Sequence, residues 1–171
     1  PNSATAPPTL RGCIRRAPSE LPPVTRQPRS YLFVPGDRPE RIAKARASGA
    51  DAVIVDLEDA VAPAGKVAAR DAVAAALDAA QPVVLRINGA DTAWFADDAR
   101  LAAHPGVAAV MLPKAASPDQ VAALRAASDG RPVLALVESA AGMAGAAALA
   151  ATAGVARLVF GSIDFQLDLD I

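Results

Sequence analysis

Short apolar runs alternate with Ala-rich, charge-dotted stretches from Ser30 to the last residue of the chain. Runs of this kind bounded by turn residues predict strands, and the stretches between them have helical spacing. Six strands are expected, at 31–34, 52–56, 83–88, 108–112, 133–138 and 158–161. They recur at intervals of about 25 residues, the length of one βα unit. The central runs lack strict alternation, which is typical of parallel strands covered on both faces.

Several helix boundaries can also be predicted. Ser117, followed by Pro118 and by Gln120 three positions later, has the pattern of a capping box at the start of a helix. The segment 37–40 has a similar pattern, and Gly49 is expected to end the helix that follows it. The Ala- and Gly-rich stretch 140–153 indicates a helix of small residues.

Six βα units are compatible with two architectures, an open doubly wound sheet and a closed eightfold barrel. The rhythm of strands and helices does not distinguish them. A dinucleotide-binding fold would carry a G-x-G-x-x-G fingerprint after its first strand, but this chain has Val-Pro-Gly-Asp at 34–37. The sequence therefore argues against nucleotide binding of that kind.

Composition divides the chain at residue 29. Residues 1–29 are rich in Pro and Arg, with Glu20 as their one acidic residue. Such a segment buries little apolar area, so we expect a flexible tail followed by one domain at 30–171. A transit peptide is the alternative, because the segment is Arg-rich and nearly free of acid, although its prolines oppose an amphipathic helix.

Net charge, cysteine content and hydropathy limit the kinds of partner, the kinds of site and the cell compartment that can be expected. The net charge is −1, which gives no sign of nucleic-acid binding. No apolar run reaches the roughly 18 residues that span a bilayer, so no membrane partner is expected. The single cysteine, Cys13, excludes an internal disulfide and a cysteine-based zinc site, and suggests a reducing compartment.

Polar residues follow most of the predicted strands, where parallel α/β folds place their chemistry. They are Asp56, Glu58, Asp59, Arg86, Asn88, Lys114, Glu138, Ser139 and Asp164. Carboxylates without His or Cys among them suit a hard cation with oxygen ligands, which favours Mg²⁺ over zinc. Glu138 and Asp164, from neighbouring strands, are the expected pair of ligands, since Mg²⁺ usually takes one or two protein carboxylates. An arginine beside them would present a planar fork to a carboxylate or a developing enolate.

Each of these residues also has a structural interpretation. A carboxylate at a strand end commonly caps a helix or pairs with a basic side chain, and Lys114 could be such a partner as readily as a catalytic group. His104 precedes Pro105 and Gly106 at a predicted helix end, where capping is the better explanation. Trp94 and Phe95 are expected to be apolar packing.

Six motifs together resemble one known family. The segments 31–41 (YLFVPGDRPER) and 49–61 (GADAVIVDLEDAV) are followed in order by motifs at 86–88, 112–114, 136–140 and 160–165. This order is similar to that of the citrate lyase beta-subunit and malyl-CoA lyase group, within the HpcH/HpaI aldolase superfamily. The resemblance extends from about Ser30 to the end of the chain and is specific for the family rather than for one substrate.

The resemblance implies a (β/α)₈ TIM barrel, of which about six βα units are present. It implies a Mg²⁺-dependent CoA-ester lyase that cleaves or forms the C–C bond of a 3-hydroxyacyl-CoA such as citryl-CoA or malyl-CoA. The products would be acetyl-CoA and a 2-oxo acid. A cytoplasmic homo-oligomer, a trimer or hexamer, is expected by the same analogy.

The resemblance also implies roles for individual residues. Glu138 and Asp164 would bind the metal, and Arg86 would contact the substrate near the reacting carbons. Glu58 and Asp59, which we expect to be catalytic together with Arg86, would lie near the metal and contact it through water. The CoA phosphates would be bound from the loop after the first strand, by Arg38 and Arg41.

The chain departs from the family in length. It stops after the sixth predicted strand, and we expect it to be part of a longer enzyme whose missing C-terminal segment supplies an acid/base group. Two alternatives remain open. One is a free-acid aldolase of the same superfamily, acting on 4-hydroxy-2-oxo acids; the other is an inactive fragment that binds metal or CoA.

Overall fold

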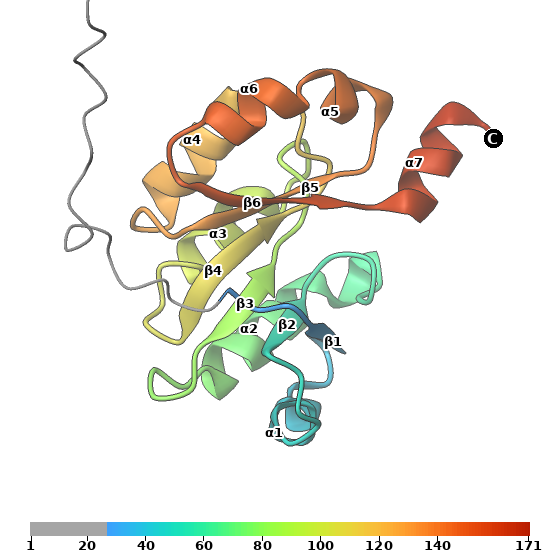
Figure 1. Ribbon diagram of the computed structural model, residues 1–171. Helices are drawn as coiled ribbons and strands as arrows, with labels where there is room; N and C mark the ends of the chain where they lie inside the picture. The colour runs from blue at the N-terminus through green and yellow to red at the C-terminus, as the bar shows by residue number, and fades with distance from the viewer. Residues whose placement is uncertain (1–26) are drawn as a thin grey trace, which may run out of the picture.

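The computed structural model describes residues 27–171, which contain one six-stranded, wholly parallel sheet (Figure 1). Its strands are β1 (Tyr31–Pro35), β2 (Ala52–Asp56), β3 (Val83–Arg86), β4 (Val107–Leu112), β5 (Val133–Val137) and β6 (Val155–Phe160). They lie side by side in the order of the sequence. A doubly wound sheet reverses its order at an internal strand, whereas a barrel does not. The observed order is that of a partial (β/α) barrel, as predicted, with β1 and β6 as its edges.

Helices connect successive strands. They are α1 (Ile42–Arg46), α2 (Lys66–Ala76), α3 (Phe95–Leu101), α4 (Pro118–Ala127), α5 (Ala140–Ala144), α6 (Ala146–Ala151) and α7 (Ser162–Leu169), with short 3₁₀ turns η2 (Pro39–Arg41) and η3 (Pro63–Gly65). Consecutive members of the series α2, α3, α4 and α6 contact one another, so they form one layer against the sheet. Parallel crossovers are right-handed, and strands added in sequential order therefore place their helices on the same face. No helix within residues 27–171 is long and apolar enough to cross a membrane.

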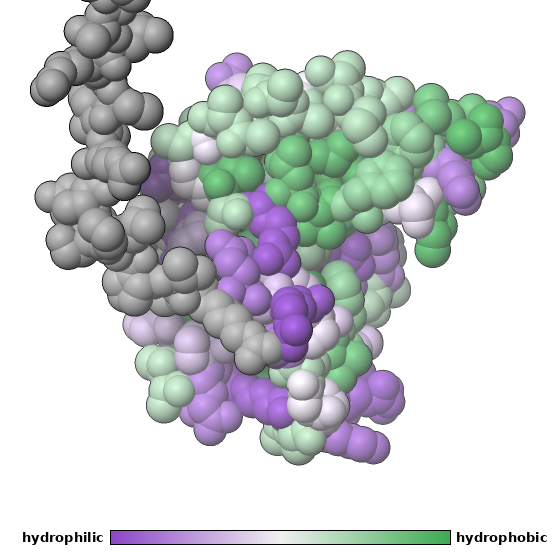
Figure 2. Space-filling model, viewed as in Figure 1, coloured by the Kyte–Doolittle hydropathy of each residue, from purple (hydrophilic) through white to green (hydrophobic). Residues whose placement is uncertain are grey.

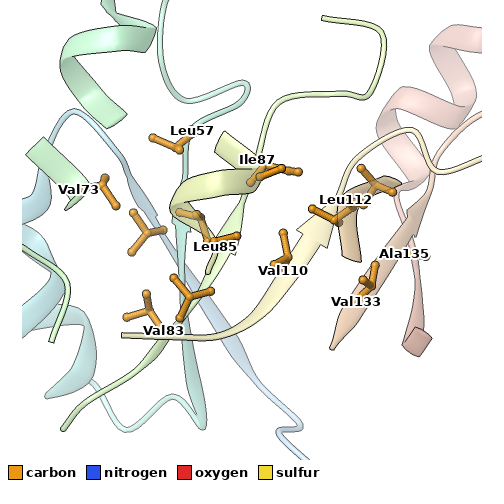
Figure 3. Close-up of a cluster of buried hydrophobic side chains, with 14 of the residues drawn as sticks. Leu57, Val73, Val83, Leu85, Ile87, Val110, Leu112, Val133 and Ala135 are labelled. Atoms are coloured by element: carbon orange, nitrogen blue, oxygen red, sulfur yellow. The ribbon is translucent and has the colours of Figure 1, made fainter. Parts of the chain in front are cut away.

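Alternate residues of each strand enter two separate apolar clusters. The outer cluster lies between sheet and helices and includes Leu85, Val110 and Leu112 (Figure 3). The inner cluster lies on the opposite face; its buried members are Ile54, Val84, Met111, Leu134 and Leu136. Because successive side chains of a strand point to opposite faces, the residues in register with the inner cluster line the barrel interior.

Arg157 ties the two edge strands together across this interior. From β6, its Nη1 donates hydrogen bonds to the Pro28 carbonyl at 2.8 Å and to the Tyr31 hydroxyl at 3.3 Å. Asp51 accepts a bond from the backbone N–H of Arg29 at 2.8 Å. Gln27 accepts a further bond from Arg157 Nη2 at 3.1 Å, so the last three residues of the predicted tail, 27–29, bond to the barrel. The rest of that segment, 1–26, lies outside the described residues.

Three sequence-based boundaries are corrected. The last strand begins at Val155, three residues earlier than predicted. The capping box predicted at 37–40 is wrong: a 3₁₀ turn at Pro39–Arg41 begins there without a side-chain cap, and Glu40 instead accepts a hydrogen bond from Arg38. The helix predicted at 140–153 is two helices that meet at Gly145, where a Cβ would lie 2.5 Å from the Ala116 carbonyl oxygen. By contrast, the capping box at Ser117 is confirmed.

Candidate functional site

The C-terminal ends of the strands gather most of the predicted site residues around one hollow. This hollow of about 760 Å³ is lined by Asp59, Arg86, Glu138 and Asp164 at its polar end, and by side chains of the inner cluster further down. Glu58 lies beside it, 3.1 Å from Arg86. Figure 2 shows apolar surface over β6 and around α7, where Phe160, Ile163 and Leu167 are exposed.

Arg86 is held by Asp56, a carboxylate for which no individual role was predicted. Asp56, the last residue of β2, is buried and accepts hydrogen bonds from Nε and Nη2 of Arg86, both at 2.7 Å. The same carboxylate accepts the backbone N–H groups of Glu58 and Ala60. Burial disfavours the charge of Arg86, but its bonds to Asp56 outweigh this and raise the pKa of the guanidinium. The fork of Arg86 predicted for substrate is therefore bound to Asp56, and the Nη1 side faces the hollow.

Glu58 is a buried carboxyl group whose Oε2 accepts no hydrogen bond within residues 27–171. Its Oε2 lies 3.1 Å from Arg86 Nη1, at an angle that forms no hydrogen bond. Burial raises the pKa of Glu58 to about 7; the charge of Arg86 opposes this shift, and those of Asp59 and Glu138 add to it. A carboxyl group with such a pKa can hold or release a proton near neutral pH.

The titration of Glu58 should appear in the stability of the fold. Because the folded pKa is raised above the ordinary 4.5, the folded protein keeps a proton that the unfolded chain releases. The protonated Glu58 side chain thus makes its full contribution to the free energy of unfolding below pH 4.5. This contribution is lost as the pH rises to about 7. We expect Glu58→Gln to reduce the fall of the urea midpoint across this window. Part of the fall should remain, since burial also raises the pKa of Glu138. Equal slopes in both proteins would contradict the assignment.

Glu138 follows β5 and is fixed by the turn that follows β4. Its Oε1 accepts the backbone N–H of Lys114 at 2.8 Å, and the side chain is buried. Burial raises the pKa of Glu138, the bond from Lys114 opposes this, and the negative charge of Asp164 adds to it. Asp164 lies in the first turn of α7 and is half-buried. The two carboxylates are thus close enough to repel, and a cation between them would relieve the repulsion.

These residues fit a hydrated magnesium ion better than a fully protein-ligated one. Within residues 27–171 no three His, Cys, Asp or Glu side chains form a group that could hold a metal. Mg²⁺ commonly binds through one or two carboxylates and fills its octahedron with water and substrate oxygens. Glu138 and Asp164 would serve as such a pair, with Glu58 and Asp59 nearby.

Gly161 leaves room for the Glu138 carboxylate. A Cβ at this position would lie 2.7 Å from Oε2 and 2.8 Å from Cβ of Glu138. We therefore expect Gly161→Ala to displace Glu138 and to weaken Mg²⁺ binding by about tenfold, the size of effect seen when support of a metal ligand is removed. Titration calorimetry measures this. Gly65→Ala is the matched control, because its Cβ would meet Val61 at an ordinary 3.6 Å; equal effects of the two changes would refute the steric explanation.

Arg38 and Arg41 lie apart from this hollow. Arg38 pairs with Glu40 on the surface, while Arg41 lines a separate hollow between β1 and α1. Their predicted contact with CoA phosphates stays a prediction. His104 has a structural contact, since its Nδ1 accepts the Gly106 N–H at 3.0 Å.

Lys66 is a site residue that the sequence did not reveal. It begins α2, is buried, and donates from Nζ to the carbonyls of Leu57 and Glu58 at 2.9 and 2.6 Å. Its ammonium also lies over the Trp94 ring, 5.5 Å from the centroid. Lys66 thereby fixes the loop that carries Glu58. A lysine at the start of a helix is ordinarily exposed, so no local pattern signals this role.

The fold and the site define a partial (β/α) barrel whose C-terminal mouth carries carboxylates suited to a hard divalent cation. Similarity to known proteins identifies the family. The chain belongs to the HpcH/HpaI aldolase/citrate lyase family, whose sequence model matches residues 29–171. The resemblance predicted from the six motifs is therefore confirmed.

Curated relatives of known sequence lie within the same group. A citrate lyase subunit beta-like protein of Mycobacterium tuberculosis is 46% identical over 134 residues, covering 78% of this chain and 47% of the relative. A (3S)-malyl-CoA thioesterase of Cereibacter sphaeroides is 36% identical over 145 residues, covering 82% of this chain and 51% of the relative. The chain spans about half the length of the curated relatives it matches.

Solved structures agree with the sequence relatives. The citrate lyase beta subunit of M. tuberculosis complexed with oxaloacetate and magnesium has a TM-score of 0.72 at 45% identity, over 82% of this chain and 60% of that one. A structure of the same protein with magnesium, acetoacetate and coenzyme A also has a TM-score of 0.72, over 82% and 51%. These similarities place this chain on the fold of the family.

Proposed function

We propose that this chain carries the metal site of a Mg²⁺-dependent CoA-ester lyase. The reaction is cleavage or formation of the C–C bond of a 3-hydroxyacyl-CoA such as citryl-CoA or malyl-CoA. One observation supports this most directly: Glu138 and Asp164 lie at one hollow with Arg86, on a chain similar to proteins solved with magnesium, oxaloacetate and coenzyme A. Acetyl-CoA and a 2-oxo acid are the products of cleavage.

Glu138 and Asp164 would hold the ion at the mouth of the hollow. Bound Mg²⁺ supplies Lewis-acid polarisation of the 2-hydroxy or 2-oxo oxygen. In cleavage the hydroxyl proton passes to the Glu58 carboxylate, the C–C bond breaks, and the electron pair of that bond passes to the thioester enolate. Nη1 of Arg86, which Asp56 does not bind, would exchange its 3.3 Å contact with the exposed Asp59 for that negative charge and stabilise it.

A proton must then reach the enolate carbon to give acetyl-CoA. Glu58 is suited to hold it, because burial raises its pKa to about 7 and its Oε2 makes no hydrogen bond among the described residues. Asp59, which Arg86 contacts at 3.3 Å, is the more exposed neighbour and is suited to exchange protons with water. We also propose that the enzyme is a cytoplasmic homo-oligomer of three or six subunits. Arg38 and Arg41 would bind the phosphates of CoA.

Thioester hydrolysis is the second candidate, because the Cereibacter relatives bear the name (3S)-malyl-CoA thioesterase. Product analysis separates the candidates. Malyl-CoA and citryl-CoA are incubated with the protein and Mg²⁺, and the products are resolved by chromatography. A lyase gives acetyl-CoA with glyoxylate or oxaloacetate, whereas a thioesterase gives free CoA with malate or citrate.

The same assay addresses the remaining alternatives. A 4-hydroxy-2-oxo acid without CoA is included as a substrate of the free-acid aldolase. Cleavage of this compound alone would overturn the CoA-ester proposal. Binding of Mg²⁺ and CoA without any turnover would instead identify an inactive binding fragment.

A further inference from the structure

Five cationic side chains line these hollows, and three of them, Lys66, Arg86 and Lys114, lie at the C-terminal edge of the sheet. The other two, Arg29 and Arg157, lie toward the N-terminal ends of β1 and β6. Of the three at the C-terminal edge, two are committed to the protein. Asp56, Glu58 and Asp59 surround Arg86, and two backbone carbonyls accept bonds from Lys66. A substrate anion that approaches this edge would therefore need to displace protein contacts to reach either group.

Lys114 differs from the other two. Its side chain is exposed on the ridge between two hollows, one lined by Glu138 and Asp164 and the other by Asn88 and Trp94. Within residues 27–171 no carboxylate oxygen lies within ion-pair distance of its ammonium group. Burial raises the pKa of both Glu58 and Glu138, and the positive charge of Lys114 opposes that rise, so Lys114 acts on the centre of the site.

The backbone of Lys114 is held in a conformation that lysine rarely adopts. Its φ is +49°, in the left-handed region that favours glycine and asparagine. The two other non-glycine residues of positive φ in the described part of the chain are both aspartates, a type that tolerates this region. The conformation directs the Lys114 N–H at Glu138 Oε1, at 2.8 Å. The backbone of Lys114 thus positions a metal ligand, while its ammonium stays free for a group bound beside that ligand.

We propose that Lys114 determines specificity by binding a second carboxylate of the 2-oxo acid, the one that the metal does not take. This inference rests on the proposed function. A 2-oxo acid held at Glu138 and Asp164 would place its substituent at the mouth, where carboxylates repel an anion and Lys114 offers the uncommitted cation. Acids with a distal carboxylate, such as oxaloacetate, are then favoured over acids that end in a methyl group.

Titration calorimetry in the presence of Mg²⁺ tests this with two acids of equal chain length. Oxaloacetate carries the distal carboxylate, and 2-oxobutyrate has a methyl group in its place. We expect Lys114→Met to weaken oxaloacetate binding about fivefold, the upper range for an exposed ion pair, and to leave 2-oxobutyrate within about twofold. Lys114→Arg, which keeps the charge and the same backbone strain, should restore oxaloacetate binding. Thermal melts of each variant check the fold.

The outcomes separate this inference from the proposed function. Selective loss for oxaloacetate with recovery in Lys114→Arg supports it. Equal loss for both acids, or no loss for either, overturns the role of Lys114 while the metal site stands. Failure of the unchanged protein to bind either acid with Mg²⁺ overturns the proposed function and this inference together.

Discussion

Replacing Glu138 by Gln or Asp164 by Asn is expected to lower Mg²⁺-dependent turnover by at least about 100-fold, more than the loss of a supporting contact near a metal. Each change removes one of the two anionic groups proposed to hold the ion. Gln at 138 can still accept the Lys114 N–H, and Asp164 is only half-buried, so neither change should unfold the protein. Turnover is measured as a function of Mg²⁺ concentration, with direct calorimetry of metal binding alongside.

The control for these variants is the same chemical change away from the site. Asp119→Asn removes an exposed carboxylate from the first turn of α4. It should leave turnover and Mg²⁺ affinity unchanged and cost at most about 0.5 kcal/mol of stability. Wild-type rates and affinities in both site variants would refute the metal assignment.

Arg86→Lys should be damaging in two separate ways. Asp56 is buried and accepts two bonds of 2.7 Å from the planar edge of Arg86, a geometry that an ammonium group cannot reproduce. Partial loss of a buried charged pair should lower the free energy of unfolding by about 1–3 kcal/mol. Loss of the Nη1 group that faces the hollow should reduce kcat/KM by about 100-fold, as for other donors to a developing negative charge. Urea unfolding and steady-state kinetics measure the two effects.

Arg100→Lys provides the comparison on the surface. Arg100 is exposed and pairs with Asp97 three residues earlier, so its replacement should change stability by less than about 0.5 kcal/mol. If Arg86→Lys matched this control in urea midpoint and in kcat/KM, neither the structural nor the catalytic role of Arg86 would hold.

The strands could be predicted because their physical cause is local. Buried parallel strands need continuous apolar runs, and these runs occur at all six observed positions. The choice between open sheet and barrel depends on strand order, which no local pattern encodes. Helix ends were predictable where one side chain completes a cap, as at Ser117. The break at Gly145 was not, because its cause is the approach of a carbonyl 29 residues earlier, that of Ala116.

In the site, too, some features follow from a simple rule, whereas others depend on contacts between distant residues. Parallel strands bring their C-terminal residues to one edge, and this rule alone placed Glu138, Asp164 and Arg86 at one hollow. The rule does not predict which of the neighbouring carboxylates will form an ion pair with the Arg86 side chain. Arg86 pairs with Asp56 because those two residues are partners in the β2–β3 register. Nor could the sequence show that Lys66 is buried, since that depends on carbonyls eight and nine positions earlier.

The contact of Arg157 with the start of the barrel bears on the order of folding. Its bonds to Pro28 and Tyr31 join residues 129 and 126 positions apart. Each neighbouring pair of strands, by contrast, closes a much shorter loop. Contacts between distant parts of a chain form only after their large loss of chain entropy is offset by nearer ones. The Arg157 bridge therefore forms late, after the intervening strands have assembled. It acts mainly on the rate at which the folded sheet opens rather than on the rate at which it forms.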